Sequence, residues 1–268
     1  MSRNSSVWKK FVTVTIAAIS IIGFGACGSS NNSSSVGELD QIKENGEIVF
    51  GTEGTYAPFS YHDADDKLTG YDVEVATAVA KELGVKAKFV EANWDSLLAG
   101  VDAKKFDTVA DQVAPSDERK QKYDFTDLYT YSQGVAVTKK GNDDIKTFAD
   151  IKGKNAAETK TSNWNQTAQE NGANIVSVND FAQAVDAITS GRAEVTLNLA
   201  VLDYLKQKPD AEVQISAKSE VSPAAAFPIR KGEDDLVKAV NDALAKLRKK
   251  GVLEKLSVKY FGEDVSVK

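Results

Sequence analysis

The chain has 268 residues, of which 42% are hydrophobic and 27% charged, and its formal net charge is −6. An acidic balance disfavours nucleic acid, which needs clustered cations. One cysteine and one histidine leave few ligands for thiol or metal chemistry. We therefore expect no nucleic-acid partner, no metal and no cofactor. We expect His62, in a polar stretch from 62 to 67, to be an exposed turn residue rather than a catalyst.

The first predicted element is a targeting segment. Cationic residues precede an apolar run from Phe11 to Phe24, and small residues follow it, which is the zoning of a signal peptide. The run is too short for a comfortable membrane span. Cys27 falls at the expected cleavage point, where a lone cysteine cannot close an intramolecular disulfide. We expect residues 1–26 to be a signal peptide and residues 27–35, rich in Gly, Ser and Asn, to be a flexible tether.

Strand and helix signals alternate from residue 47 onward. Apolar residues at helical spacing predict a helix over Tyr71–Leu83, and Gly84 supplies its stop. Short apolar runs before and after it predict strands. The predicted elements, in order, are Glu47–Gly51, Tyr71–Leu83, Lys86–Val90, Asp95–Val101 and Asp107–Ala110. This strand-helix-strand-helix-strand unit implies a parallel sheet with right-handed crossovers.

The same order of signals appears a second time. Its predicted elements are Lys154–Glu158, Ser162–Asn171, Asn174–Val178, Asp180–Ser190 and Ala193–Leu197. Two similar α/β halves predict two lobes. Extended stretches at 129–140 and 220–231 are placed to cross from one lobe to the other and back, as two hinge crossovers. The amphipathic pattern of Asp234–Lys250 predicts a last helix that completes the first lobe.

These halves predict an α/β fold with a ligand cleft between its lobes. Residues 36–131 and 226–268 would form lobe 1, and residues 132–225 would form lobe 2. In open α/β sheets, ligands bind beyond the carboxyl ends of the strands. The loops after the predicted strands should therefore face this cleft. Tyr56, Phe59 and Trp94 lie in such loops and supply aromatic walls.

The stretch from Phe106 to Arg119 predicts an anion site in the same cleft. A short buried strand ends there in a polar loop, and Ser116 or Asp117 is placed to cap the helix that follows. The free N–H groups of a helix start favour an anion. Arg119 is either a bidentate clamp for a carboxylate or part of a solvated helix face. With Thr161 and Ser162 at the start of a helix in the second lobe, the loops predict a pocket for a small zwitterion.

Several stretches, spread in order over the mature chain, resemble the polar amino acid-binding proteins of ABC importers. They are GTEGTYAPFSY at 51–61, LTGYDVEVATAVAKELG at 68–84, NWDSLLAGVDAKKFD at 93–107, DERKQKYDFTDLYTYS at 117–132 and LRKKGVLEKLSVKYFGED at 247–264. The stretches NWDSLLAGVDAKKFD, DQV and KTSNW look most like the cystine-binding branch. The resemblance implies a two-lobed periplasmic-binding-protein-like fold of type II. It also implies ligand capture by hinge closure, delivery to a membrane permease, and no catalysis.

The resemblance extends to the leader. Gly25-Ala26-Cys27 resembles a bacterial lipobox, although Phe24 stands where that motif usually has an aliphatic residue. It implies lipidation of Cys27 and anchoring of the protein on the extracytoplasmic face of the cell membrane. We expect a monomer.

Residue roles follow from the same resemblance. Arg119 matches the arginine that pairs with the α-carboxylate of the ligand, helped by the backbone N–H of Ala114 and by Thr161. The aromatic residues match positions that enclose the ligand side chain, and Asp111 and Gln112 lie where acceptors meet the α-amino group. The expected ligand-binding residues are Tyr56, Phe59, Trp94, Asp111, Gln112, Ala114, Arg119, Thr161, Ser162 and Asn198.

The chain departs from the family pattern at two places. Ala114 replaces a Ser or Thr, so a hydroxyl contact is lost. The run Leu197-Asn198-Leu199-Ala200 lacks the aspartate that is the main partner of the ligand's ammonium group in the family. A buried ammonium without a counter-charge costs several kcal/mol. Either Asn198, Asp111 or Glu158 replaces that acid, or Asp203 in the next helix does, or the pocket binds weakly or prefers another ligand.

Two other functions stay open. The same two-lobed fold supports dehydratases, and an acidic chain offers paired carboxylates at Glu53, Asp95, Asp111 and Glu118, but acid-base catalysis needs a geometry that sequence does not give. A surface adhesin is the third possibility. Neither a basic stripe nor a tandem repeat supports it.

Overall fold

The structure is a computed structural model that describes residues 37–199, 205, 210–219 and 224–268. The chain divides into two units, Met1–Ser35 and Val36–Lys268, and the described residues all belong to the second. The predicted signal peptide, the tether with Cys27, and Asp203 lie outside the described residues. Within the described ranges, no helix is long and apolar enough to cross a membrane.

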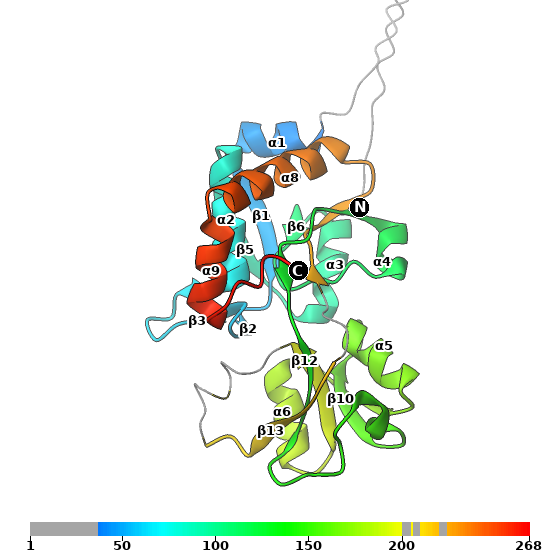
Figure 1. The fold of residues 1–268 in the computed structure, drawn as a ribbon. Helices are drawn as coiled ribbons and strands as arrows, with labels where there is room; N and C mark the ends of the chain where they lie inside the picture. Colours follow the sequence, from blue (N-terminus) through cyan, green and yellow to red (C-terminus); the bar gives the residue numbers. More distant parts are fainter. Residues whose placement is uncertain (1–36, 200–204, 206–209, 220–223) are drawn as a thin grey trace, which may run out of the picture. The chain divides into compact units, whose positions relative to one another are not determined.

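The first predicted unit forms a three-stranded parallel sheet in the order β5-β1-β6 (Figure 1). Its elements are β1 (Glu47–Thr52), α2 (Tyr71–Leu83), β5 (Lys86–Glu91), α3 (Trp94–Asp102) and β6 (Thr108–Val109). The predicted strand-helix alternation is confirmed, but β6 is shorter than expected. Asp107 still binds β1, because its backbone N–H donates to the Val49 carbonyl at 2.9 Å and its side chain accepts the N–H of Val49 at 2.7 Å.

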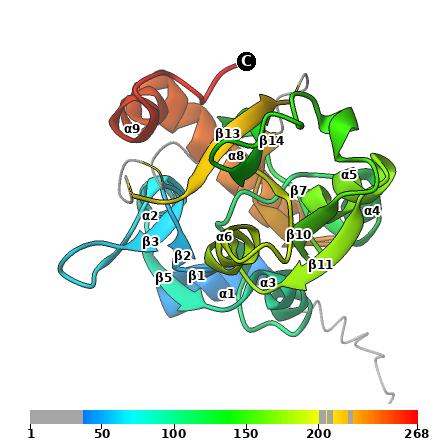
Figure 2. The same ribbon diagram turned by 90° about the horizontal axis from the view of Figure 1, so that it is seen from below.

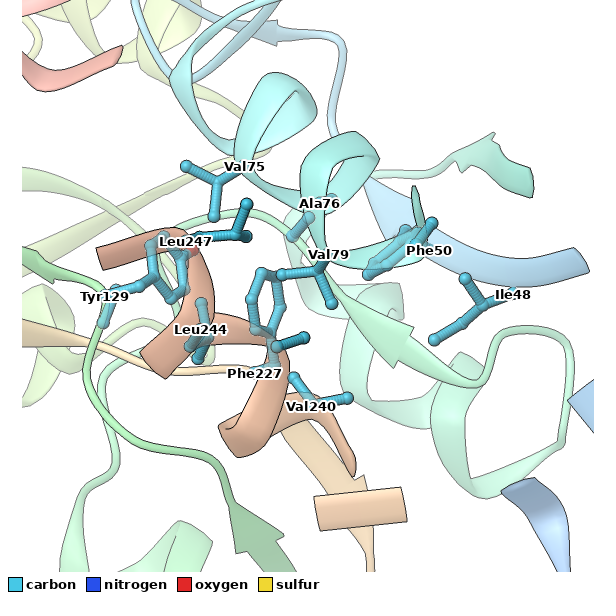
Figure 3. Packing of buried hydrophobic residues seen from close by; sticks show 14 of the residues in the cluster. Ile48, Phe50, Val75, Ala76, Val79, Tyr129, Phe227, Val240, Leu244 and Leu247 are labelled. Carbon is cyan, nitrogen blue, oxygen red and sulfur yellow. The ribbon is translucent and has the colours of Figure 1, made fainter. Parts of the chain in front are cut away.

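The core of this unit follows from the two-residue period of β1. Ile48 and Phe50 point to the face covered by α2, whereas Val49 belongs to the cluster around α3 on the other face. The helix α8 (Asp234–Lys249) packs on the first face through Val240, Leu244 and Leu247, as Figure 3 shows. The predicted last helix is thus confirmed as part of this core. A further helix, α9 (Val252–Phe261), packs beside it and was not predicted.

The second predicted unit forms a five-stranded sheet in the order β11-β10-β12-β9-β13. Its elements are β9 (Gly134–Lys139), β10 (Asn155–Thr159), α5 (Asn163–Glu170), β11 (Asn174–Val178), α6 (Phe181–Thr189), β12 (Val195–Leu199) and β13 (Val213–Lys218). The three predicted strands pair in parallel. The stretch 129–140, predicted only as a crossover, contributes β9, which lies antiparallel between β12 and β13. It enters the sheet because Val135, Ala136 and Val137 are all buried.

The two faces of this sheet are covered by different helices. Val135, Val137 and Ala157 cluster with α6, and their sequence neighbours Ala136 and Ala156 cluster with Ala168 of α5. The alternation follows from strand geometry, in which successive side chains point to opposite faces. In Figure 2, α6 and α5 are separated by the strand β10.

The two predicted crossovers lie side by side. Residues of β8 (Thr130–Tyr131) pair antiparallel with β14 (Ala224–Ala225), and β7 (Tyr123–Phe125) pairs with β15 (Pro228–Arg230). The structure therefore has the α/β fold with two strand-helix units and two crossovers that the sequence predicts; the lobe boundaries stay a prediction. The other described elements are α1 (Glu38–Asn45), β2 (Thr55–Tyr56), β3 (Ser60–His62), β4 (Leu68–Thr69), α4 (Asp117–Lys122) and the 3-10 helix η1 (Phe148–Ile151).

Candidate functional site

Residues at the carboxyl ends of strands from both sheets line one cavity. Glu53 follows β1, Asp111 follows β6, and Thr159, Val178 and Asn198 lie at the ends of β10, β11 and β12. The empty volume is about 520 Å³, including solvent at the mouth. This position, beyond the carboxyl ends of the strands, is that of a small-molecule site in an open α/β fold.

Six of the predicted ligand-binding residues line this cavity. They are Tyr56, Trp94, Asp111, Gln112, Ser162 and Asn198. Ala114 lines a smaller space of about 210 Å³, which shares Gln112, Asn163, Trp164 and Leu199 with the main cavity. Phe59, Arg119 and Thr161 are not among the lining residues of either space.

Phe59 lies in the core instead of the cavity wall. Its side chain is completely buried, and its ring centroid lies 5.0 Å from that of Tyr56 and 5.6 Å from that of Phe261. The packing of α9 covers this ring, which the sequence pattern around Phe59 does not reveal. In this structure Phe59 supports Tyr56 from behind, and Tyr56 is the aromatic residue that meets the cavity.

Arg119 joins two loops beside the cavity. Ser116 caps α4 by accepting the N–H of Arg119 at 3.3 Å, as predicted. The guanidinium donates to the carbonyl oxygens of Ala114 and Thr161, both at 3.0 Å, and lies 5.4 Å from the ring centroid of Trp94. Burial lowers the pKa of Arg119, but a guanidinium stays charged in proteins. The carboxylate clamp stays a prediction, since two of its nitrogens already bind backbone carbonyls.

Thr161 is held in place by hydrogen bonds to Asp95 of α3. Its N–H and hydroxyl both donate to Oδ1 of Asp95, at 2.9 and 2.7 Å. Asp95 lies in the first turn of α3. Ser162, the next residue, caps α5 by accepting the N–H of Asn165 at 3.1 Å. These bonds fix the loop that carries Ser162 to the cavity wall.

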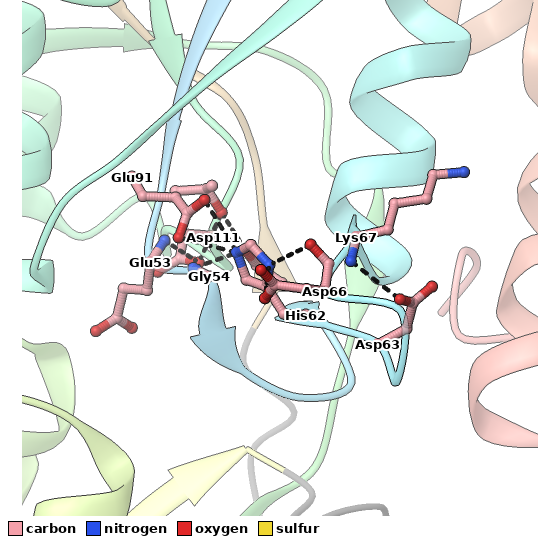
Figure 4. A network of polar contacts seen from close by, with 10 residues as sticks. Glu53, Gly54, His62, Asp63, Asp66, Lys67, Glu91 and Asp111 are labelled. Atoms are coloured by element: carbon pink, nitrogen blue, oxygen red, sulfur yellow. Dashed lines mark hydrogen bonds and ion pairs between the residues drawn. The ribbon is translucent and has the colours of Figure 1, made fainter.

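Glu53, which is half-buried, and Asp111, which is buried, form an acid pair at the cavity; Figure 4 labels both. The backbone N–H of Glu53 donates to Oδ1 of Asp111 at 3.3 Å, and both side chains line the cavity. Burial raises the pKa of Glu53 to about 7 and that of Asp111 well above its usual range, and their mutual repulsion adds to the second shift. The pair therefore carries a proton near neutral pH.

His62 lies outside this site. It ends β3, and its Nε2 lies 3.0 Å from Glu91 (Figure 4). It is not a lining residue of the cavity.

A strained backbone carries Asp111 and Gln112 into position. Gln112 has a φ of +54°, in the left-handed region that favours glycine. Asp72, at the start of α2, accepts both the N–H and the side-chain amide of Gln112 at 2.7 Å. Burial raises the pKa of Asp72 to about 8. The two bonds offset the cost of the unusual conformation.

The opposite wall contains residues that sequence reasoning did not place at the site. Trp164, Asp180 and Phe181 line the cavity. Trp164 belongs to the KTSNW stretch, one of those that resemble the cystine-binding branch, so the sequence could have indicated its place at the site. Asp180 was predicted only as part of a helix. Asn198 accepts a hydrogen bond of 2.5 Å from the Tyr56 hydroxyl, which connects the two walls.

The cavity is suited to a cationic group beside apolar surface. Its lining includes four carboxyl groups, Glu53, Asp111, Glu158 and Asp180, and among the described residues that line it there is no Lys, Arg or His. Within the same ranges, no group of three or more His, Cys, Asp or Glu is arranged to hold a metal ion. Fold and site together define a small-molecule-binding protein with two α/β halves.

Comparison with known proteins identifies the family. The chain matches the model of the bacterial extracellular solute-binding proteins, family 3, over residues 48–263, and it belongs to that family. It is 48% identical over 260 residues to the L-cystine-binding protein TcyA of Bacillus subtilis, covering 96% of this chain and 97% of that protein. It is 41% identical to TcyJ, an L-cystine-binding protein of Escherichia coli, over 86% of this chain and 88% of that protein.

Solved structures agree with the fold. An ancestral arginine-binding protein bound to arginine matches 81% of this chain and 99% of its own, with a TM-score of 0.76 at 33% identity. An ancestral amino acid-binding protein described as a precursor of cyclohexadienyl dehydratase matches 84% of this chain and 100% of its own, with a TM-score of 0.74 at 34% identity.

Proposed function

We propose that this chain is the extracytoplasmic binding protein of an ABC importer, that it captures a polar amino acid, and that L-cystine is its ligand. The observation that carries the proposal is the cavity lined by strand ends of both sheets. A ligand bound there contacts both halves, so it favours their closure by its differential affinity for the closed state. The closed form is then presented to a membrane permease. The two L-cystine-binding relatives support the choice of ligand.

The ligand's α-carboxylate binds Arg119 and the N–H of Ala114 in this proposal. The α-ammonium group binds the Glu53–Asp111 pair, which replaces the aspartate missing after Asn198. The acids are supported in this role by their position on the wall and by Oδ2 of Asp111, which has no hydrogen-bond partner among the described residues. Tyr56 and Trp94 enclose the side chain.

We further propose that the protein works as a lipid-anchored monomer. Cleavage after residue 26 would leave Cys27 as the lipidated first residue, and residues 28–35 would act as a tether. Tethering at the membrane raises the concentration of the loaded protein near its permease.

A catalytic function is the second candidate, and we propose that the protein is not an enzyme. The Glu53–Asp111 pair is the observation that favours catalysis, because a carboxyl with a pKa near 7 suits general acid-base chemistry. Stoichiometric binding with recovery of unchanged ligand supports the binding protein. Formation of a product supports the enzyme.

The proposal is tested by calorimetry and thermal unfolding of the purified protein with the twenty amino acids and L-cystine under non-reducing conditions. A ligand at a hundredfold excess over Kd stabilises the fold by about 2.7 kcal/mol, which raises the melting temperature measurably. We expect L-cystine to do so and Arg119→Ala to abolish the shift. If no amino acid binds, the proposal is wrong and an adhesive role or another ligand class takes its place.

A further inference from the structure

The four carboxyl groups of the cavity lie in two electrostatically separate places, because Glu53 interacts with Asp111 and Asp180 whereas Glu158 interacts with none of them. Glu53 and Asp111 repel each other, and this repulsion adds to the effect of burial on the pKa of Asp111. Glu158, at the end of β10, belongs to the second sheet. Burial is the sole cause that raises its pKa, and no other charged group contributes. A cation bound by the acid pair therefore leaves Glu158 uncompensated.

Glu158 is buried without a cation in the described part of the chain. Its side chain is 3% exposed and lines the cavity. One oxygen, Oε1, accepts the N–H of Leu197 at 2.7 Å and a weak bond of 3.5 Å from the Thr196 hydroxyl. These are bonds that a neutral amide oxygen makes equally well. Burying a carboxyl rather than an amide costs free energy unless a cation compensates it.

The wall around Glu158 supplies no such cation. Its neighbours in the lining are Ala157, Thr159 and Thr196, which carry no charge, and Arg119 is occupied at the Ala114 and Thr161 carbonyls. Without such a cation, the raised pKa keeps the buried Glu158 carboxyl neutral, and a cationic group of the ligand beside it would favour the ionised form. Both acidic places belong to the lining of one cavity, so a single ligand bound there can contact both.

We propose that Glu158 binds a second cationic group of the ligand, so that the cavity selects amino acids with two separated ammonium groups over those with one. The proposal rests on the proposed function and deepens it. L-cystine belongs to this class because it carries an α-ammonium group at each end, and L-lysine belongs to it through its side chain. Glu158 is thus a specificity-determining residue, and the acid pair holds the ammonium group that all amino acids share.

Two matched ligand pairs test the proposal by calorimetry. The first is L-cystine and the mixed disulfide of L-cysteine with 3-mercaptopropionic acid, which keeps both carboxylates and lacks one ammonium group. The second is L-lysine and L-norleucine. We expect the wild-type protein to bind the diammonium member at least about tenfold more tightly in the pair it accepts, since breaking a buried charge pair has a large cost.

The variant Glu158→Gln keeps an acceptor for the N–H of Leu197 and removes the charge. We expect this variant to reduce the preference for the diammonium member over the monoammonium member to about twofold or less. The Kd of the monoammonium member should stay as in the wild-type protein. Glu170→Gln, at an exposed residue of α5, is the matched control and should keep the wild-type preference.

Three results overturn the proposal. If Glu158→Gln weakens both members of a pair equally, Glu158 has only a structural role at β12. If the wild-type protein binds both members equally, or prefers the monoammonium member, amino-acid capture stands and this inference fails. If no amino acid binds at all, both the proposed function and this inference fail.

Discussion

Asp72 holds Gln112 through two hydrogen bonds of 2.7 Å, one to the backbone N–H and one to the side-chain amide. The residues lie 40 positions apart, at the start of α2 and in the loop after β6. Since Gln112 has a φ of +54°, the carboxylate of Asp72 stabilises a backbone that this residue type rarely adopts. The same bonds set the direction of the loop that carries Asp111 to the cavity.

Asp72→Ala should therefore be strongly destabilising. It leaves two buried donors of Gln112 without an acceptor, and we expect the free energy of unfolding to fall by about 2–4 kcal/mol. Urea unfolding followed by circular dichroism measures the change. Asp143→Ala, at an exposed loop position, is the control and should change the free energy by less than about 0.5 kcal/mol. Similar values for the two variants would contradict the role given to Asp72.

Arg119→Lys should weaken ligand binding although it keeps the positive charge. An ammonium group cannot donate in two fixed directions as the guanidinium does toward Ala114 and Thr161. We expect Kd for the preferred amino acid to rise at least about tenfold, which corresponds to about 1.4 kcal/mol. Titration calorimetry measures it, with Lys120→Arg at the exposed neighbour as the control. An unchanged Kd would exclude Arg119 as the carboxylate clamp.

The stability of the ligand-free protein should fall as the pH rises through the range in which Glu53 titrates. Its pKa is raised from 4.5 to about 7, mainly by burial, so the folded state binds more protons than the unfolded state in this range. Stability is therefore lost as the pH rises from about 4.5 to about 7. Glu53→Gln should reduce this slope in chemical unfolding experiments, and Glu118→Gln, at an exposed carboxylate, should not. Equal slopes in all three proteins would rule out the buried acid pair as the cause.

Ligand binding should release protons near neutral pH. A cationic group beside the Glu53–Asp111 pair favours the ionised form, which lowers the pKa of the pair. Affinity should then increase as the pH rises toward about 7, and Glu53→Gln should remove most of this increase. Calorimetry at pH 6 in two buffers of different ionisation enthalpy counts the protons. Release of none would place the ligand's ammonium group elsewhere.

Gly134→Ala should disturb the cavity wall by displacing the side chain of Trp164. A Cβ atom at residue 134 would lie 2.4 Å from Cη2 of Trp164 and 2.9 Å from Oγ of Ser219. Trp164 lines the cavity, so its displacement should raise the Kd several-fold, and overpacking should lower the free energy of unfolding by about 1–3 kcal/mol. Gly37→Ala, which meets no atom within 4 Å, should change neither value. A normal Kd in Gly134→Ala would mean that Trp164 does not shape the ligand site.

The sequence by itself determined the local elements and their order. The predicted ranges Tyr71–Leu83 and Asn174–Val178 have the bounds found in the structure, and the helix start predicted at Ser116 is capped as expected. Helix and strand formation depends on the spacing of apolar residues and on capping residues next to them in the chain, and both can be read locally. The two α/β halves also predicted the cleft, and the family resemblance added the expected roles of its residues, six of which line the cavity.

Only the tertiary structure decided which side chains reach the cavity. Tyr56 and Phe59 lie close together in the sequence. In the structure, however, the ring of Phe261 covers that of Phe59, and Tyr56 lines the cavity wall. Glu118 and Glu158 look alike in the sequence, but the first is solvated and the second is buried beside β12. Burial depends on packing between segments far apart in the chain, and burial sets the pKa values and the unpaired charges on which ligand choice depends.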